Sequence, residues 1–91
     1  MPITVHLPTA LRRFTNGADV VECDITNLEE LLYELDRMHP GLGRYLYDES
    51  GKIRQFINIF VNEEDIRFIG GGKYQFQDGD EVMLVPSIAG G

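Results

Sequence analysis

The sequence predicts an α+β fold in which one main helix packs across one face of a mixed β-sheet. Two observations support this prediction: a single strong amphipathic helix pattern spans residues 27–38, and separate strand patterns occur both before and after it. For a chain of 91 residues, one helix and one sheet are about as much as one core can support. Residues 1–91 are therefore expected to form a single domain, with an extended C-terminal tail over about residues 86–91.

The first strands are predicted from alternation. Apolar and polar residues alternate over residues 3–7, which is the period of a half-buried strand, and His6 would point away from the core. Pro8 ends this strand. Asn16-Gly17 favours a tight turn, and a second strand follows at Val20–Cys23, so this part of the chain predicts a β-hairpin.

The helix at residues 27–38 carries its own start and stop signals. Thr26 and Glu29 have the spacing of a capping box, in which each side chain accepts a hydrogen bond from a free N–H at the helix start. Leucines with helical spacing form one apolar stripe, and Pro40-Gly41 ends the helix. One further short helical turn is predicted at residues 42–46.

The second half of the chain predicts more strands. A clear strand spans residues 55–61, a turn follows at 62–65, a short return strand is expected at 66–68, and the last strand spans 82–85. Gly70-Gly71-Gly72 is interpreted as flexible rather than as a phosphate loop, because neither Lys-Ser nor Lys-Thr follows and no helix begins there. The first and last strands are expected to pair in parallel at the centre, which places the tail at a sheet edge.

Charge and composition exclude several classes of function. The net charge is −7 and the basic residues are scattered, so no nucleic-acid partner is expected. Acidity favours a partner with a basic surface or, alternatively, only keeps the protein in solution. No apolar run approaches the roughly 20 residues that span a bilayer, and the first residues do not resemble a signal peptide. We therefore expect no membrane association and a cytoplasmic location.

The residue types needed for metal or nucleophile chemistry are sparse. Cys23 is the single cysteine, so the chain cannot form an internal disulfide or hold an iron–sulfur cluster as a ferredoxin does. His6 and His39 belong to no recognisable metal or nucleophile motif. We expect no bound metal or cofactor.

Strand alternation predicts one uncovered sheet face. If the odd-numbered residues of strand 55–61 meet the helix, the even-numbered ones must point away from it, and the same logic applies to the last strand. A contiguous exposed apolar patch usually marks a partner site. The alternative is that residues 66–68 or 74–76 cover part of it. The predicted patch lies beside the start of the tail and contains His6, Phe60, Met83 and Val85.

The chain ends in Pro86-Ser87-Ile88-Ala89-Gly90-Gly91. If extended, this segment reaches roughly 20 Å at 3.3–3.6 Å per residue, and its small side chains leave it narrow enough to enter another protein. A carboxylate needs activation, most simply by attack on the α-phosphate of ATP. The chain has no nucleotide-binding loop, so another protein would supply that step. The alternative is a frayed terminus of small residues.

Residues 56–68 and 78–91 resemble the MoaD/ThiS family of ubiquitin-like sulfur carriers, and the resemblance covers nearly the whole chain. It implies a ubiquitin-like β-grasp fold. It also implies that a ubiquitin-activating-type adenylyltransferase and sulfurtransferase uses ATP to adenylate the Gly91 carboxylate, which then becomes a thiocarboxylate. Gly90, which has no side chain, would form the narrow segment that precedes that group. The chain itself would be a co-substrate rather than an enzyme.

Within the family, the sequence is most similar to carriers that serve cysteine synthesis. Such carriers give sulfide to a serine-derived acceptor on a pyridoxal-phosphate-dependent cysteine synthase, which leaves cysteine attached to the tail for later hydrolysis. The first alternative is the small subunit of molybdopterin synthase, whose partner is the large subunit. A ubiquitin-like protein modifier and a plain interaction module are further alternatives. Besides Gly91, the expected partner-binding residues are His6, Phe60, Met83, Val85, Pro86, Ile88, Ala89 and Gly90.

Overall fold

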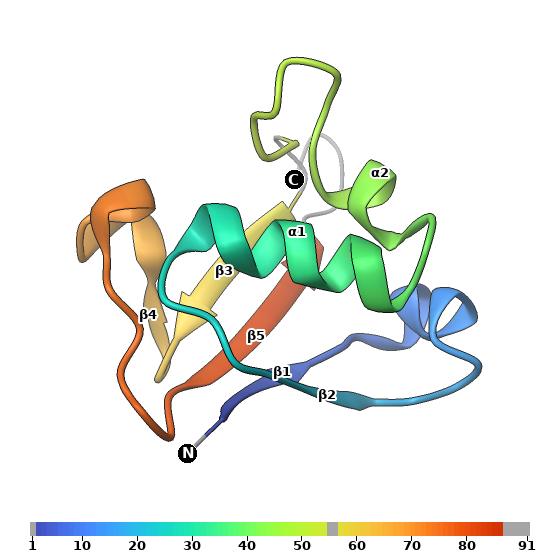
Figure 1. The fold of residues 1–91 in the computed structure, drawn as a ribbon, viewed down its shortest axis with the longest axis horizontal. Helices are drawn as coiled ribbons and strands as arrows, with labels where there is room; N and C mark the ends of the chain where they lie inside the picture. The colour runs from blue at the N-terminus through green and yellow to red at the C-terminus, as the bar shows by residue number, and fades with distance from the viewer. Residues whose placement is uncertain (1, 55–56, 87–91) are drawn as a thin grey trace.

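The computed structural model describes residues 2–54 and 57–86. In this part of the chain, five strands form one mixed sheet in the order β2-β1-β5-β3-β4 (Figure 1). β1 and β5 run parallel at the centre, as expected, and the other neighbouring pairs are antiparallel. The strands are β1 (Ile3–His6), β2 (Val20–Cys23), β3 (Ile57–Val61), β4 (Glu64–Asp65) and β5 (Glu81–Pro86).

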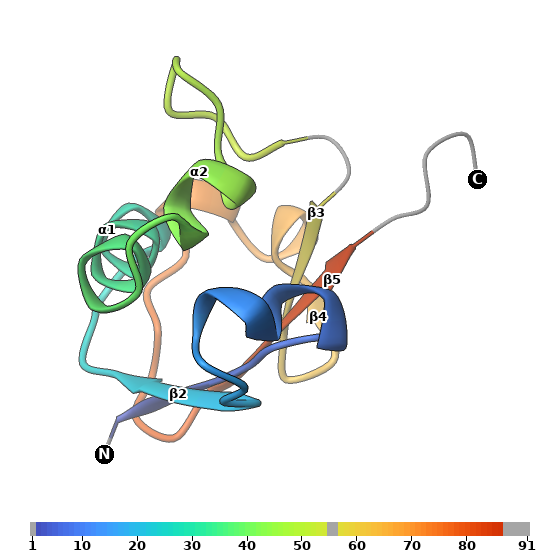
Figure 2. The same cartoon turned by 90° about the vertical axis from the view of Figure 1, so that its right-hand side faces the viewer.

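The main helix, α1 (Leu28–Met38), lies across one face of this sheet (Figures 1 and 2). The cap at the start of this helix lies one residue later than predicted. The Oδ1 of Asn27 accepts from the N–H of Glu30 at 2.9 Å, and the Oε1 of Glu30 accepts from the N–H of Thr26 at 2.8 Å. The predicted pairing of Thr26 with Glu29 is therefore wrong, because Asn27 caps at least as well as threonine and has its own glutamate three residues later.

Short helices occupy the connections. The 3₁₀-helix η1 (Thr9–Phe14) lies inside the predicted β1–β2 hairpin and buries Leu11. The predicted short turn is confirmed as α2 (Leu42–Leu46), and two further 3₁₀-helices follow, η2 (Ile66–Phe68) and η3 (Gly71–Lys73). α2 approaches α1 so closely that a Cβ at Gly43 would lie 2.6 Å from the Cβ of Asp36.

The return strand lies two residues earlier than predicted. Asn62 and Glu63 both have positive φ, 49° and 72°, so a two-residue turn joins β3 directly to β4 at Glu64–Asp65. A turn with positive φ at both central positions matches the twist of the flanking strands. The predicted strand at residues 66–68 is therefore wrong, and this segment is η2, with Ile66 in the core.

The core fills the space between α1 and the sheet. In β3 the odd-numbered residues are buried and Asn58 and Phe60 are only partly so, while in β5 Val82 and Leu84 are buried and Met83 is exposed. The predicted assignment of the two strand faces is thus confirmed for residues 57–61 and 82–84, whereas Phe56, also predicted to point away from the helix, lies outside the described residues. A mixed sheet that holds one main helix against a single face is the β-grasp arrangement of ubiquitin-like proteins. None of the helices in residues 2–54 and 57–86 is long and apolar enough to cross a membrane.

Candidate functional site

One row of side chains crosses the sheet face that α1 leaves uncovered. Strand register pairs His6 with Met83, Met83 with Phe60, and Phe60 with Asp65. Val20 on β2 lies opposite His6 and extends the row. Directly paired residues in neighbouring strands point to the same face, so all five side chains lie on the outer face.

A groove of about 640 Å³ lies over this row, and we call it the outer-face groove. It brings together four of the predicted partner-binding residues. Met83 is 50% exposed there, while Phe60 and Val85 are half-buried. Phe76, considered as an alternative cover, is instead buried in the core. The groove is lined by His6, Phe60, Asn62, Glu63, Glu81, Met83 and Val85.

Three of these lining residues were not predicted: Asn62, Glu63 and Glu81. The Nε2 of His6 lies 2.9 Å from the Oε1 of Glu81, in an exposed contact. A signal for Glu81 was present in the sequence, because it stands two residues before Met83 on the same strand and therefore on the same face. The positions of Asn62 and Glu63 depend on the turn type, which alternation does not reveal.

A buried carboxylate fixes one wall of the groove. Asp80 is 6% exposed and accepts hydrogen bonds from the Nδ2 of Asn62 at 2.8 Å, the hydroxyl of Tyr74 at 2.7 Å and the N–H of Gln77 at 2.9 Å. The Oδ1 of Asn62 in turn accepts from the N–H of Glu81 at 3.0 Å. This network ties the β3–β4 turn to the start of β5, so it holds the acidic end of the groove in place.

The network also shifts the ionisation of its members. Burial opposes the charged form of Asp80, but the hydrogen bonds from Gln77, Tyr74 and Asn62 outweigh it and hold the pKa of the carboxyl below its usual value. Burial, assisted by the bond to Asp80, raises the pKa of Tyr74 to about 12. At neutral pH the pair is therefore a carboxylate that accepts from a neutral phenol.

The tail begins at the end of the central strand. Pro86 is the last described residue and lies opposite Ile57 of β3. Because β5 stands between β1 and β3, the chain leaves from the middle of the sheet where the strands end, so the predicted position of the tail at a sheet edge is wrong. Ser87 and the predicted site residues Ile88, Ala89, Gly90 and Gly91 lie outside the described residues.

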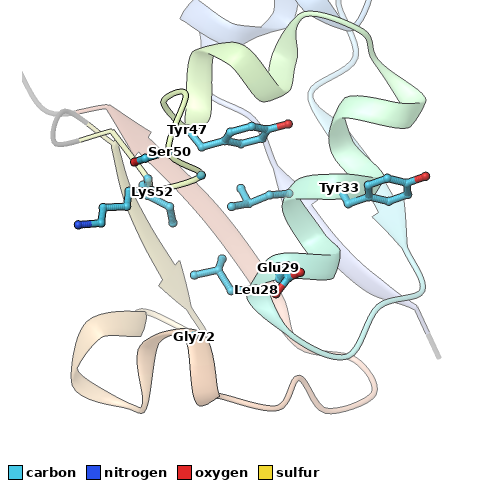
Figure 3. A pocket seen from close by; sticks show the side chains of 10 residues that line it. Leu28, Glu29, Tyr33, Tyr47, Ser50, Lys52 and Gly72 are labelled. Carbon is cyan, nitrogen blue, oxygen red and sulfur yellow. The ribbon is translucent and has the colours of Figure 1, made fainter.

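A second groove, of about 670 Å³, lies on the helix side of the sheet between the start of α1 and residues 47–53 (Figure 3). Leu28 and Ile53 are among its apolar walls, and Glu29 and Lys52 are among its polar ones.

The described ranges contain no group of three or more His, Cys, Asp or Glu residues that could hold a metal. Burial raises the pKa of the Cys23 thiol to about 11, so it is not a thiolate nucleophile at neutral pH.

Comparison with known proteins extends this description. Residues 5–91 match the model of the ThiS family. The sulfur carrier protein CysO of Mycobacterium tuberculosis is 40% identical over 93 residues, covering 100% of both chains. A chain of the crystal structure of the Amycolatopsis orientalis BexX/CysO complex superposes with a TM-score of 0.87 at 38% identity, covering 98% of this chain and 99% of that one. The crystal structure of M. tuberculosis CysO gives 0.86 at 38% identity, covering 94% and 99%.

Proposed function

Because the chain belongs to the ThiS family of sulfur carriers, we propose that it carries sulfur on the carboxyl group of Gly91 for the synthesis of cysteine. The observation that carries this proposal is the full-length 40% identity to M. tuberculosis CysO in a chain that ends in Gly90-Gly91. ThiS-family carriers are protein co-substrates rather than enzymes. Partner enzymes would therefore perform each chemical step.

The proposed loading reaction has two steps. A carboxylate oxygen of Gly91 attacks the α-phosphate of ATP on a ubiquitin-activating-type adenylyltransferase, and pyrophosphate leaves. Sulfide (HS⁻) then attacks the acyl carbon of the adenylate, AMP leaves with one of the original carboxylate oxygens, the S–H proton is lost to solvent, and a thiocarboxylate remains. No ATP site is needed on the carrier, in keeping with the absence of a phosphate-binding loop motif from its sequence.

The carrier would divide this work between a body and a tail. Residues 1–91 would act as one domain in which the sheet identifies the carrier and residues 86–91 enter the partner's active site. The outer-face groove supports the first part, because it brings His6 of β1 and Phe60 of β3 together with Met83 and Val85 of β5, the strand that leads into the tail. The Amycolatopsis CysO was crystallised together with BexX, which supports the expectation that such a carrier docks on other proteins.

The sulfur acceptor separates the proposed function from its alternatives. The loaded carrier is incubated with a pyridoxal-phosphate-dependent cysteine synthase and an activated serine, and separately with the large subunit of molybdopterin synthase. We expect cysteine to appear attached to the tail in the first reaction, as detected by intact mass. A chain that lacks Gly90 and Gly91 is the control and should remain unloaded.

Three results would contradict the proposal. Sulfur transfer only to the molybdopterin synthase subunit would assign the chain to that pathway. Isopeptide conjugates to lysines of other proteins, without thiocarboxylate chemistry, would indicate a protein modifier. Unchanged cysteine synthesis with the truncated chain would remove Gly91 from the mechanism.

A further inference from the structure

We propose that an acidic flank on the outer face orients the carrier on its activating partner by pairing with a basic patch of that partner. The acidic flank consists of Glu22, Glu63 and Glu81. The inference rests on the proposed function and adds to it the chemistry of the partner surface. It explains how one docking direction is selected on the outer sheet face.

Strand register places the acidic flank in one row. Thr4 of β1 lies opposite Glu22 of β2 on one side and opposite Glu81 of β5 on the other, so both carboxylates point to the outer face. Glu63, in the adjoining β3–β4 turn, lines the outer-face groove together with Glu81. All three glutamates are exposed.

Among residues 2–54 and 57–86, little positive charge on the same face opposes the flank. The groove lining contains no lysine or arginine, and His6 is the basic side chain that contacts Glu81. Arg67 is the cation at the β4 end of the row, but it makes a two-pronged contact with Asp65, with 2.7 Å between Nη2 and Oδ2. The flank therefore retains net negative charge, and a cationic partner surface complements it.

The position of the flank along β5 gives it a directional role. From Glu81 to Pro86 the chain advances five residues, or roughly 16 Å at about 3.3 Å per residue. Met83 and Val85 lie between these two ends. A partner that contacts the flank, then Met83 and Val85, and then the tail must meet them in that order. It should therefore carry lysines or arginines roughly 16 Å from the mouth of the site that receives the tail.

A second copy of this chain is a poorer occupant than a basic partner. Each copy carries a net charge of −7, and two outer faces brought together would juxtapose two acidic flanks. The predicted state of the free carrier is therefore monomeric, and analytical ultracentrifugation measures it. A stable dimer that Met83→Asp dissociates would assign the face to self-association and overturn the inference.

The main test uses charge reversal with a matched control. Glu22→Lys, Glu63→Lys, Glu81→Lys and the triple variant are compared with Glu49→Lys, which makes the same charge change in a surface groove beside α1 and α2. The purified activating enzyme is the probe, and pyrophosphate release gives KM and kcat for each carrier. Thermal unfolding by circular dichroism confirms that each variant is folded.

We expect each flank reversal to raise KM roughly three- to tenfold at low ionic strength without changing kcat, because rim charges act mainly on association. The effect should be larger in the triple variant and shrink at high ionic strength, whereas Glu49→Lys should leave KM unchanged. Normal adenylation with no response to the flank variants, or an equal response to Glu49→Lys, overturns this inference alone. A wild-type carrier that the enzyme does not adenylate overturns the proposed function and this inference with it.

Discussion

Two neighbouring residues of β5 provide a test of which sheet face binds partners and which face packs in the core. Met83 points to the outer-face groove and is 50% exposed, while Leu84 points to the core and is 1% exposed. We predict that Met83→Asp leaves the protein folded but impairs loading, and that Leu84→Asp unfolds it. The same chemical change is thus made twice, one residue apart, on opposite faces.

The magnitudes follow from burial. Full burial of a methionine contributes about 1.5–3 kcal/mol, so a half-buried Met83 contributes about 1 kcal/mol, and the poor strand preference of aspartate costs up to about 1 kcal/mol more. The sum, about 2 kcal/mol, is below the roughly 5–15 kcal/mol of a typical domain. Truncating Leu84 costs about 2–5 kcal/mol, and an unpaired buried carboxyl adds a few more, so the total reaches the lower part of that range.

Urea unfolding followed by far-ultraviolet circular dichroism measures both effects, and intact mass after incubation with ATP, a sulfide source and the activating enzyme measures loading. Met83→Asp should unfold cooperatively at a lower urea concentration than the wild type and load more slowly. The reasoning is refuted if Met83→Asp is the unfolded variant, or if it folds and loads at the wild-type rate.

Three further predictions concern the interior. The depressed pKa of Asp80 means that its stabilising contribution is present above its unfolded pKa of about 3.9 and is lost as pH falls below that value. Asp80→Asn should therefore lower the unfolding free energy at neutral pH and flatten the decline of that free energy in acid. Acid profiles that run parallel in the variant and the wild type would contradict this. Cys23, with its pKa raised to about 11, should react with an alkylating reagent only after denaturation, and rapid reaction of the native protein would show that the thiol is accessible. Gly43→Ala should cost about 1–3 kcal/mol in urea unfolding, because the new Cβ would meet Asp36, whereas Gly72→Ala, with open space around it, should cost little.

The sequence predicted those features of the fold that follow from the regular spacing of apolar residues along a strand or helix. Alternation in β3 and β5 assigned Phe60 and Met83 to the outer face correctly, because a strand that is buried on one side repeats every two residues. The parallel pairing of β1 with β5 followed from the order of the elements. The sulfur chemistry of Gly91, in contrast, was predicted from family resemblance and remains a proposal.

Other features depend on a choice between near-equal local options. Thr26 and Asn27 are both good helix caps, and each has a glutamate three residues later, so sequence alone did not select Asn27. The early return strand requires Glu63 to adopt positive φ, which non-glycine residues seldom do. Such choices are decided by packing of the rest of the chain.

The buried carboxylate was missed for a different reason. Asp78-Gly79-Asp80 has the composition of an exposed turn, and nothing local distinguishes its second aspartate from its first. Asp80 is buried because Asn62, 18 residues away, and Tyr74 donate to its carboxylate. Long-range hydrogen bonds of this kind become visible only in three dimensions.

The central claim is that the Gly91 carboxyl group carries the sulfur. Tandem mass spectrometry of the chain after incubation with ATP, a sulfide source and the activating enzyme tests this most directly. We predict a mass increase equal to the exchange of one oxygen atom for one sulfur atom, located in the C-terminal fragment that contains Gly91. Sulfur found on Cys23 or on any other residue, with an unmodified C-terminal fragment, would contradict the account.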